Sequence, residues 1–251
     1  MSRFVKTIQR SLGKGLRAHK MIEEGDRVLV GVSGGKDSLT LLQLMVERQR
    51  YVAPHFDLIA GHIDGGFPGN TPEHLQRLRN HFKTLAVPYH IVKADIAAQA
   101  LDPKATKNPC FICAHHRRHA IYKLAHETGC NKIAYAHHKD DIIETLLLNI
   151  LYGRRIEAMH PVQEVFNGRM HIIRPLAYAD ESLIKRYAVE MQLPTWPKIC
   201  PADGKTRRER VKKLIREIQS QEPHANIREN IFKSLQHVHI DPTSTTGGAR
   251  R

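Results

Sequence analysis

Short apolar segments alternate in this chain with longer segments whose apolar residues have helical spacing. Strands are expected at 27–31, 58–63, 89–92, 132–136 and 171–176. Helices are expected from about 36 to 46, from 72 onward, and at 115–127, 140–152 and 181–191. This alternation is typical of an α/β fold in which a parallel sheet carries helices on both faces. Ligands of such sheets bind beyond the carboxyl ends of the strands.

The turn between the first strand and its helix has the composition of a phosphate-binding loop. Glycines let backbone N–H groups approach an anion, and the helix amino terminus adds partial positive charge. Lys36 can neutralise a phosphate, whereas Asp37 would be repelled by one and suits a role through Mg²⁺. The expected ATP-binding residues of this loop are Ser33, Gly34, Gly35, Lys36, Asp37 and Ser38.

The loop differs from the Walker pattern G-x-x-x-x-G-K-[ST], because only Gly34 and Gly35 precede Lys36. It resembles instead the pyrophosphatase-type loop, or PP-loop, of the N-type ATP hydrolases. That resemblance implies an adenine-nucleotide α-hydrolase-like fold that cleaves ATP to AMP and pyrophosphate. A glycine turn without ligand, ahead of a helix, is the simpler alternative.

A second polar segment, Ala-His-His-Lys-Asp-Asp at 136–141, follows the fourth expected strand. Its place at a strand end predicts that it lies on the same edge of the sheet as the phosphate loop. Asp140 and Asp141 are expected to hold Mg²⁺, and Asp140 also to cap its helix. Together with Glu144 and Thr145, the segment resembles the A/G-H-x-x-D-D-x-x-E-T pattern of the same superfamily.

Two further side chains at strand ends are candidates for the nucleotide site. His137 is expected to contact ATP, and Asp64, after the second strand, to mark the position of the nucleoside. The expected catalytic residues are Lys36, Asp37, Asp140 and Asp141.

Cys110 and Cys113 form a C-x-x-C pair just ahead of the helix expected at 115–127, and Cys200 follows far along the chain. A C-x-x-C pair alone suits zinc, an iron–sulfur cluster or a redox dithiol. Pro201 follows Cys200, and a proline after the cysteine recurs in iron–sulfur ligand runs. Three candidate thiolates without an obvious fourth favour a [4Fe–4S] cluster with one open iron. Cys130, after a glycine at a helix end, is interpreted as a packing residue.

The chain carries a formal net charge of +14. Such an excess favours a polyanionic partner, with nucleic acid as the first candidate. Residues Phe4–Ile22 have the pattern of a basic amphipathic helix, and residues 204–219 that of a second basic helix. The expected RNA-binding residues are Arg207, Arg208 and Lys212.

Four parts are expected along the chain. They are a basic helical segment at 1–26, an ATP-binding α/β domain at 27–200, a basic helical segment at 201–240 and a disordered tail at 241–251. No apolar run approaches the roughly 18 residues that a membrane span needs, and the amino terminus lacks the apolar core of a secretory signal. We therefore expect a cytoplasmic protein with reduced cysteines and no membrane partner.

The motifs occur in an order that resembles the tRNA 2-thiocytidine synthetase family. They are the segment Met-Ile-Glu-Glu-Gly-Asp-Arg-Val at 21–28, the PP-loop, Cys110-x-x-Cys113, the segment 136–141, Arg-Pro-Leu-Ala-Tyr at 174–178, and Cys200. The resemblance implies ATP-dependent thiolation of cytidine at tRNA position 32, with Mg²⁺ and a [4Fe–4S] cluster. By position, the cluster ligands would be Cys110, Cys113 and Cys200.

The resemblance also implies a cytoplasmic homodimer that receives sulfur from a donor such as a cysteine desulfurase. The chain departs from the family where Pro197 replaces a frequent cysteine and where residues 202–205 are charged. A lysidine synthetase shares the loop and the His-His-x-Asp-Asp pattern but needs no cysteines. A nucleotide- or RNA-binding module that keeps the loop without catalysis is the alternative of another class. Trp196 suits either base stacking or packing between two prolines.

Overall fold

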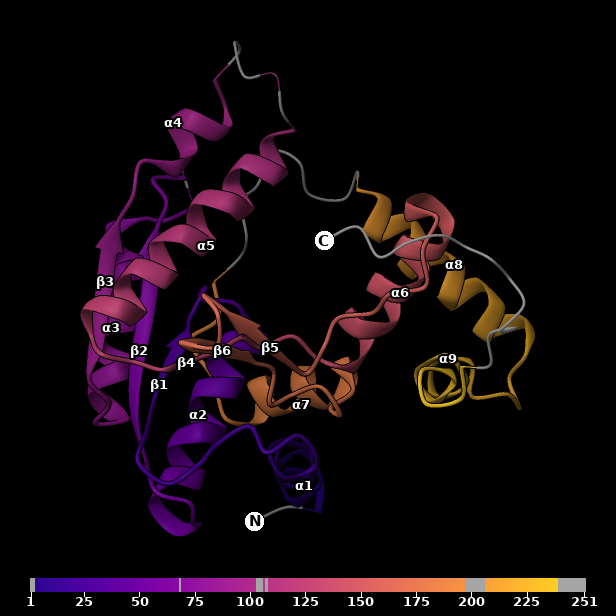
Figure 1. Ribbon diagram of the computed structural model, residues 1–251, viewed down its shortest axis with the longest axis horizontal. Coiled ribbons are helices and arrows are strands. Elements are labelled where there is room, and N and C mark those ends of the chain that lie inside the picture. The colour runs from indigo at the N-terminus through magenta and orange to yellow at the C-terminus, as the bar shows by residue number, and fades with distance from the viewer. Residues whose placement is uncertain (1–2, 68, 103–105, 107, 197–205, 239–251) are drawn as a thin grey trace. The chain divides into compact units, whose positions relative to one another are not determined.

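The computed structural model describes residues 3–67, 69–102, 106, 108–196 and 206–238 (Figure 1). The chain divides into two units, residues 1–142 with 159–206 and residues 143–158 with 207–251. The tail expected at 241–251 and the expected ligand Cys200 lie outside the described residues. In the ranges that are described, no helix is long and apolar enough to cross a membrane.

The first unit is built on a six-stranded sheet with the order β3-β2-β1-β4-β6-β5. Its strands are β1 Asp26–Gly31, β2 Phe56–Asp64, β3 Tyr89–Lys93, β4 Lys132–Ala134, β5 Val162–Val165 and β6 Met170–Ile173. All neighbouring pairs are parallel except β5 and β6. The predicted parallel sheet is confirmed, and an unpredicted antiparallel strand closes one edge.

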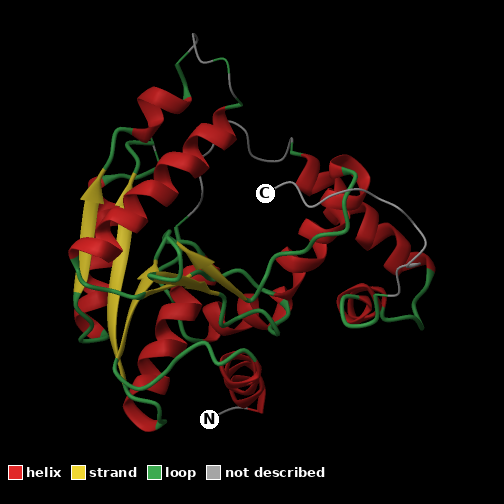
Figure 2. Ribbon diagram, in the orientation of Figure 1, coloured by secondary structure: helices red, strands yellow, loops and turns green. Residues whose placement is uncertain are grey.

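Helices cover both faces of this sheet (Figure 2). In the first unit they are α1 Arg3–Ala18, α2 Lys36–Tyr51, α3 Pro72–Thr84, α4 Ile96–Ala100, α5 Pro109–Glu127, the start of α6 Lys139–Gly153, and α7 Glu181–Glu190. Successive strand residues point to opposite faces. Val28 and Val30 of β1 therefore join the core beneath α1, α2, α3 and α7, whereas Leu29 joins the core beneath α4 and α5.

The amphipathic helix predicted ahead of the first strand is present as α1. Its apolar face is buried in the core of the first unit through Ile8 and Leu12, which are 0% and 2% exposed. A Cβ atom on Gly15 would lie 2.7 Å from the carbonyl oxygen of Pro175, so only glycine allows this close approach. The Tyr178 hydroxyl lies 3.1 Å from His19 Nε2. The segment at 174–178 therefore packs directly against α1.

Helix α5 begins at Pro109, earlier than the expected start at 115. Asn108 caps it by accepting the backbone N–H of Cys110 at 2.8 Å, and a proline at the first helical position suits this start. The expectation that Cys110 and Cys113 precede the helix is therefore wrong. Both lie in its first turns.

Strands β4 and β6 end at Ala134 and Ile173, before the expected limits of 136 and 176. After β4 the chain turns to begin α6, and after β6 the N–H of Ala177 closes a turn on the carbonyl of Arg174 at 3.0 Å. After β4, Tyr135 still donates its N–H to the carbonyl of Ile173 at 2.9 Å, so only after β6 does a turn hydrogen bond replace the ladder.

The second unit contains the rest of α6 together with α8 Arg207–Gln221 and α9 Ile227–Ser234. Its core is small and is formed by Ile143, Val211 and Ile215, with Phe232 packed against them. The basic helix predicted in 204–219 is confirmed as α8, although it begins at Arg207.

A buried ion pair joins the starts of β1 and β4. Lys132 Nζ lies 2.6 Å from Asp26 Oδ2, and the two residues are 6% and 5% exposed. Asp26 also accepts the N–H of Glu23 at 2.6 Å and the amide of Asn131 at 2.7 Å. Burial alone would raise the pKa of Asp26, but the hydrogen bond from Lys132, with those from Glu23 and Asn131, holds it below its ordinary value.

Replacing Lys132 by Met should lower the free energy of unfolding by about 3–5 kcal/mol at neutral pH, because Asp26 is left charged and buried. The measurement is urea unfolding. The control Asp57→Asn removes an exposed pair with Arg27, 3.5 Å apart, and should cost less than about 1 kcal/mol. Equal effects of the two substitutions would contradict the structural importance of the buried pair.

Stability of the wild-type protein should fall as acid protonates Asp26. Because the pKa of Asp26 is depressed in the folded state, its contribution is complete above the unfolded value of about 3.9. It is lost as pH falls through the lower folded value. Unfolding of Asp26→Asn by urea at several pH values should lack this component.

Candidate active site

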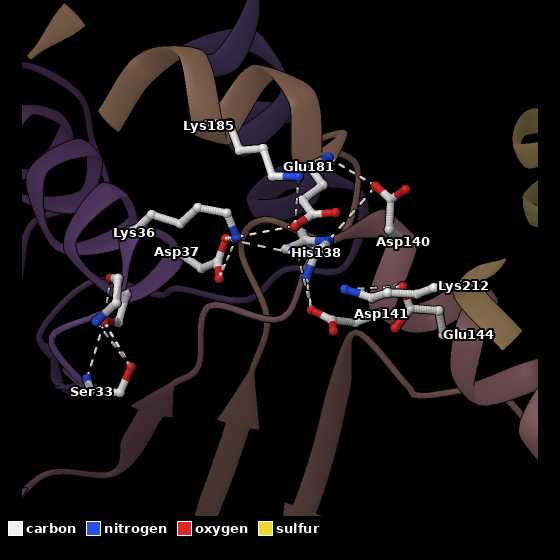
Figure 3. Close-up of polar contacts among 12 residues, drawn as sticks. Ser33, Lys36, Asp37, His138, Asp140, Asp141, Glu144, Glu181, Lys185 and Lys212 are labelled. Carbon is white, nitrogen blue, oxygen red and sulfur yellow. Dashed lines mark hydrogen bonds and ion pairs between the residues drawn. The ribbon is translucent and has the colours of Figure 1, made fainter. Parts of the chain in front are cut away.

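Strand β1 pairs with β2 on one side and with β4 on the other, so the strand order reverses between β1 and β4. The loops after both strands leave the sheet at this point. An open α/β sheet offers its ligand-binding crevice at such a switch. The phosphate loop and the segment after β4 were predicted to share this edge, and the structure brings their side chains into contact (Figure 3).

The phosphate loop is held by hydrogen bonds among its own residues. The Ser38 hydroxyl accepts the backbone N–H of Ser33 at 3.0 Å and donates to the carbonyl of Gly35 at 3.0 Å. Gly34 has φ +82°, and a Cβ atom there would lie 2.5 Å from the ring of His74. The glycine is therefore required both by the backbone and by the neighbouring side chain.

Lys36 lies between two carboxylates at the start of α2. Its Nζ is 2.8 Å from Asp37 Oδ1 and 3.2 Å from Glu181 Oε1 (Figure 3). Burial lowers the pKa of Lys36, but Asp37 and Glu181 outweigh that effect and raise it above its ordinary value. The amine therefore stays a cation at neutral pH. Sequence reasoning missed Glu181, because its position at the start of α7 did not reveal that it faces α2.

His138 is the residue that joins the two motifs. Its Nε2 lies 3.8 Å from Asp37 Oδ1 and 3.4 Å from Asp141 Oδ2, and the residue is only 3% exposed. The sequence singled out His137 instead. The pattern of two adjacent histidines could not tell which ring points to the phosphate loop.

Asp140 and Asp141 have different structural roles. Asp141 Oδ2 accepts the backbone N–H of His138 at 3.0 Å, near the start of α6. Asp140 Oδ2 accepts the N–H of Glu181, the first residue of α7, at 2.8 Å. Because Glu181 also contacts Lys36, α7 links the two loops.

The carboxylates of Asp37 and Asp141 can supply oxygen ligands to a divalent cation. Asp37 and Asp141 both reach within 4 Å of one nitrogen of His138. Within the part of the chain that the structure describes, no three His, Cys, Asp or Glu side chains are grouped to hold a metal ion. Magnesium commonly takes only one or two protein carboxylates and completes its shell with phosphates and water. The donor set therefore fits Mg²⁺ that is bound together with ATP.

The other predicted nucleotide contacts also lie at strand ends. Asp64 ends β2, where its Oδ1 accepts the N–H of Gly66 at 3.1 Å and the amide of Asn70 at 2.9 Å. It thereby shapes the loop after β2. His137 lies beside Tyr135, with ring centroids 5.7 Å apart.

Three neighbouring rings, those of His62, His74 and Trp196, pack against the phosphate loop. His62 Nδ1 lies 2.8 Å from the carbonyl of Val32, and the rings of His62 and His74 are 5.8 Å apart. Trp196 packs on His74 at 5.2 Å and donates its backbone N–H to Gly34 at 3.1 Å. Burial lowers the pKa of both histidines, which keeps them uncharged at neutral pH. Trp196 therefore has a packing role, which is one of the two roles that the sequence suggested for it.

The cysteines differ in exposure. Cys110 is exposed and Cys113 is half-buried, both near the amino terminus of α5, where the helix favours thiolates. Cys130 is buried beside Thr128, and burial raises the pKa of its thiol. This environment agrees with its interpretation as a packing residue.

In the second unit, the predicted RNA-binding cations have partners within the chain. Glu144 is 3% exposed and lies 3.3 Å from Arg208 Nη1 and 3.7 Å from Lys212 Nζ. Arg207 lies over the ring of Tyr152, 4.9 Å from its centroid. Arg208 and Lys212 therefore neutralise a buried carboxylate.

The sequence of this chain is similar to those of known proteins. Residues 4–218 match the model of the PP-loop domain family. A tRNA-cytidine(32) 2-sulfurtransferase of Alkalilimnicola ehrlichii is 41% identical over 93% of this chain and 75% of its own length. Another, from Pelobacter propionicus, is 39% identical over 93% of this chain and 86% of its own length.

Solved structures share the fold. The U34-tRNA thiolase NcsA from Methanococcus maripaludis, solved with its [4Fe-4S] cluster, superposes with a TM-score of 0.76 at 24% identity. The alignment covers 94% of this chain and 80% of NcsA. An NMN synthetase from Francisella tularensis superposes with a TM-score of 0.54 at 11% identity, over 97% of this chain and all of its own.

Replacing Glu144 by Ala should destabilise the second unit by about 1–3 kcal/mol, because two cations lose their buried carboxylate. Hydrogen exchange of α8 backbone amides should show the loss locally. The control Glu229→Ala removes a more exposed pair, in which the Glu229 side chain is 30% and the Lys233 side chain 63% exposed, and it should cost about 0.5 kcal/mol or less. Unchanged protection of α8 in Glu144→Ala would contradict the pairing.

Proposed function

This chain belongs to the PP-loop family and, within it, to the family of the tRNA-cytidine(32) 2-sulfurtransferases, and we propose that it thiolates cytidine 32 of tRNA at the expense of ATP. The observation that carries the proposal is the meeting of Lys36, Asp37, His138 and Asp141 at the switch point between β1 and β4. A lysidine synthetase or a non-catalytic module would share such a loop, but the relatives at 39–41% identity carry the sulfurtransferase name.

The chemistry requires activation because the oxygen at C2 of cytosine is a poor leaving group. In the first step this oxygen attacks the α-phosphorus of ATP, a new P–O bond forms, and pyrophosphate departs. In the second step a sulfur nucleophile attacks C2, the C2–O bond breaks, and the oxygen leaves as part of AMP. Thiolated cytidine, AMP and pyrophosphate are the products.

The side chains at the switch point suit the first step. The Lys36 cation and the loop amides would stabilise negative charge on the α-phosphate and on departing pyrophosphate. Asp37 and Asp141 would hold Mg²⁺. When bound, this ion would neutralise negative charge on the phosphates of ATP. Asp140 would position α7, and with it Glu181 beside Lys36. Ser33, Asp64 and His137 would contribute polar groups around the nucleotide.

The cysteines suit the second step. Cys110 and Cys113 are separated by one turn of α5 at its amino terminus, so both thiols share one helix face. With Cys200 they would hold a [4Fe–4S] cluster, which supplies an iron able to bind sulfur when it is present. NcsA has a similar fold, and its structure contains such a cluster. This similarity supports a [4Fe–4S] cofactor for the proposed reaction.

The proposed reaction also requires partners. tRNA is the substrate, and the net charge of +14 suits a polyanion. Arg207, Arg208 and Lys212 are proposed RNA contacts, although the last two also stabilise Glu144. A sulfur donor such as a cysteine desulfurase, a homodimeric state and a cytoplasmic location complete the proposal.

Replacing Lys36 or Asp37 by Ala should reduce tRNA-dependent pyrophosphate release by about a hundredfold or more, because Lys36 would no longer neutralise phosphate charge and Asp37 would no longer hold Mg²⁺. Lys185→Ala is the matched control. Its amine also pairs with Glu181, at 3.3 Å, but its side chain is 59% exposed. It should release pyrophosphate nearly as the wild type does, and normal release by Lys36→Ala would refute the assignment.

Replacing Cys110, Cys113 or Cys200 by Ala should abolish iron binding and thiolation together, because three thiolates leave no spare ligand. Pyrophosphate release should survive at least in part, since it needs the phosphate loop. Iron content, visible absorption and thiolated nucleoside are measured on protein purified without air. Cys130→Ala, a buried cysteine, is the control and should keep its iron.

Two results would contradict the cluster. Full thiolation by iron-free protein would leave a persulfide relay on one or two cysteines. Colourless protein that contains zinc would mean a zinc site instead.

A further inference from the structure

One side of α5 carries aromatic and basic side chains, of which Phe111, His115 and Arg118 are exposed and Tyr122 is half-buried. Phe111, His115, Arg118 and Tyr122 follow one another at intervals of three or four residues, which places them on one helix face. Phe111 is 58% exposed. Its ring is stacked with that of His115, with centroids 6.3 Å apart and planes only 9° from parallel. The pair forms an exposed flat surface at the amino-terminal end of α5.

A ring from the β5–β6 turn extends this surface. Phe166 is 53% exposed and meets the Tyr122 ring edge-on, with centroids 5.2 Å apart. Its backbone has φ +54°, a conformation that bulky residues rarely adopt. Asn167 and Gly168 also have positive φ, as a tight hairpin turn requires. The turn therefore holds an exposed apolar ring in contact with Tyr122 of α5, within the same unit.

The charge around these rings is positive. Residues 103–126 contain no Asp or Glu. Arg117 and Arg118 are exposed, and within the described part of the chain neither forms an ion pair with a carboxylate. By contrast, Arg208 and Lys212 of α8 are engaged with Glu144. The α5 surface thus offers cations that are available to an external anion.

We propose that Phe111, His115, Arg118, Tyr122 and Phe166, here called the α5 face, bind unpaired bases of the RNA substrate. The proposal rests on the proposed function and adds a surface to it. Aromatic rings stack on exposed base faces, and adjacent arginines contact the phosphates between them. A paired stem would hide its base faces, so the fitting ligand is a single-stranded loop.

The position of the α5 face relative to the thiols supports this ligand. Phe111 lies between Cys110 and Cys113 in the first turns of α5. A base stacked on Phe111 and His115 would hold a neighbouring nucleotide beside this end of the helix. An unpaired cytidine is thereby brought toward the residues proposed for sulfur transfer.

The test measures affinity for two RNA probes at several salt concentrations. One is a stem-loop with the sequence of a tRNA anticodon arm that has cytidine at position 32, and the other is a blunt duplex of equal length. Phe111→Ala and Phe166→Ala should each weaken stem-loop binding roughly tenfold, with little effect on the duplex. Their salt dependence should be unchanged. Arg118→Gln should flatten the salt slope by about 0.7.

Three controls make the result specific. Tyr51→Ala removes an aromatic side chain on α2 that is 82% exposed, and it should leave RNA binding unchanged. Phe111→Trp should keep stem-loop affinity, whereas Phe111→Leu keeps apolar bulk and should lose it. ATP binding should be unaltered in all variants, which excludes a general loss of fold.

The outcomes separate the surface from the function. If the wild type thiolates cytidine 32 while Phe111→Ala and Phe166→Ala bind the stem-loop normally, the α5 face is refuted and the function stands. If the stem-loop loses affinity in these variants but the wild type thiolates no tRNA, the face stands and the function fails. Equal loss for stem-loop and duplex, or a defect only in accepting sulfur from a donor protein, would also refute base stacking at this face.

Discussion

Strand β1 is hydrogen-bonded on both sides and covered by helices on both faces. The chain that follows β1 must therefore leave the sheet at its carboxyl edge. There it must turn at once into α2. Gly34, at φ +82° against the ring of His74, makes that turn possible. The same turn leaves the amino terminus of α2 directed at the switch point, where its N–H groups can bind an anion. The phosphate site thus follows from the way a central parallel strand must end.

Charge balance at this edge then depends on α7. Glu181 donates its backbone N–H to Asp140 and places its carboxylate beside Lys36, so one residue connects α2 with the start of α6. The segment at 174–178 sets the position of α7 through its contacts with α1. A basic helix at the amino terminus, an Arg-Pro-Leu-Ala-Tyr segment and the phosphate loop are therefore parts of one packed arrangement.

Local patterns predicted the parts of the fold whose causes are local. Thr71 caps α3 by accepting the N–H of His74, and α3 begins at residue 72 as expected. The apolar runs located five of the six strands. Strand β5 escaped prediction because Val162–Val165 is a half-exposed edge strand with only two apolar residues. Glu181 and His138 escaped because their roles depend on which elements meet in space. That Cys200 binds the same cluster as Cys110 and Cys113 is still a prediction.

Net charge could not indicate which basic segment is available to RNA. The sequence favoured α8, where cations are densest, but two of its cations lie against Glu144, which is 3% exposed. Removing a buried carboxylate from water is costly unless cations accompany it, so these side chains have a structural function before any RNA arrives. Helix α5 has fewer cations, and Lys123 pairs with Glu127, but within the described residues Arg117 and Arg118 form no ion pair with a carboxylate. Our proposal for α5 therefore rests on uncompensated charge beside exposed rings rather than on the number of cations.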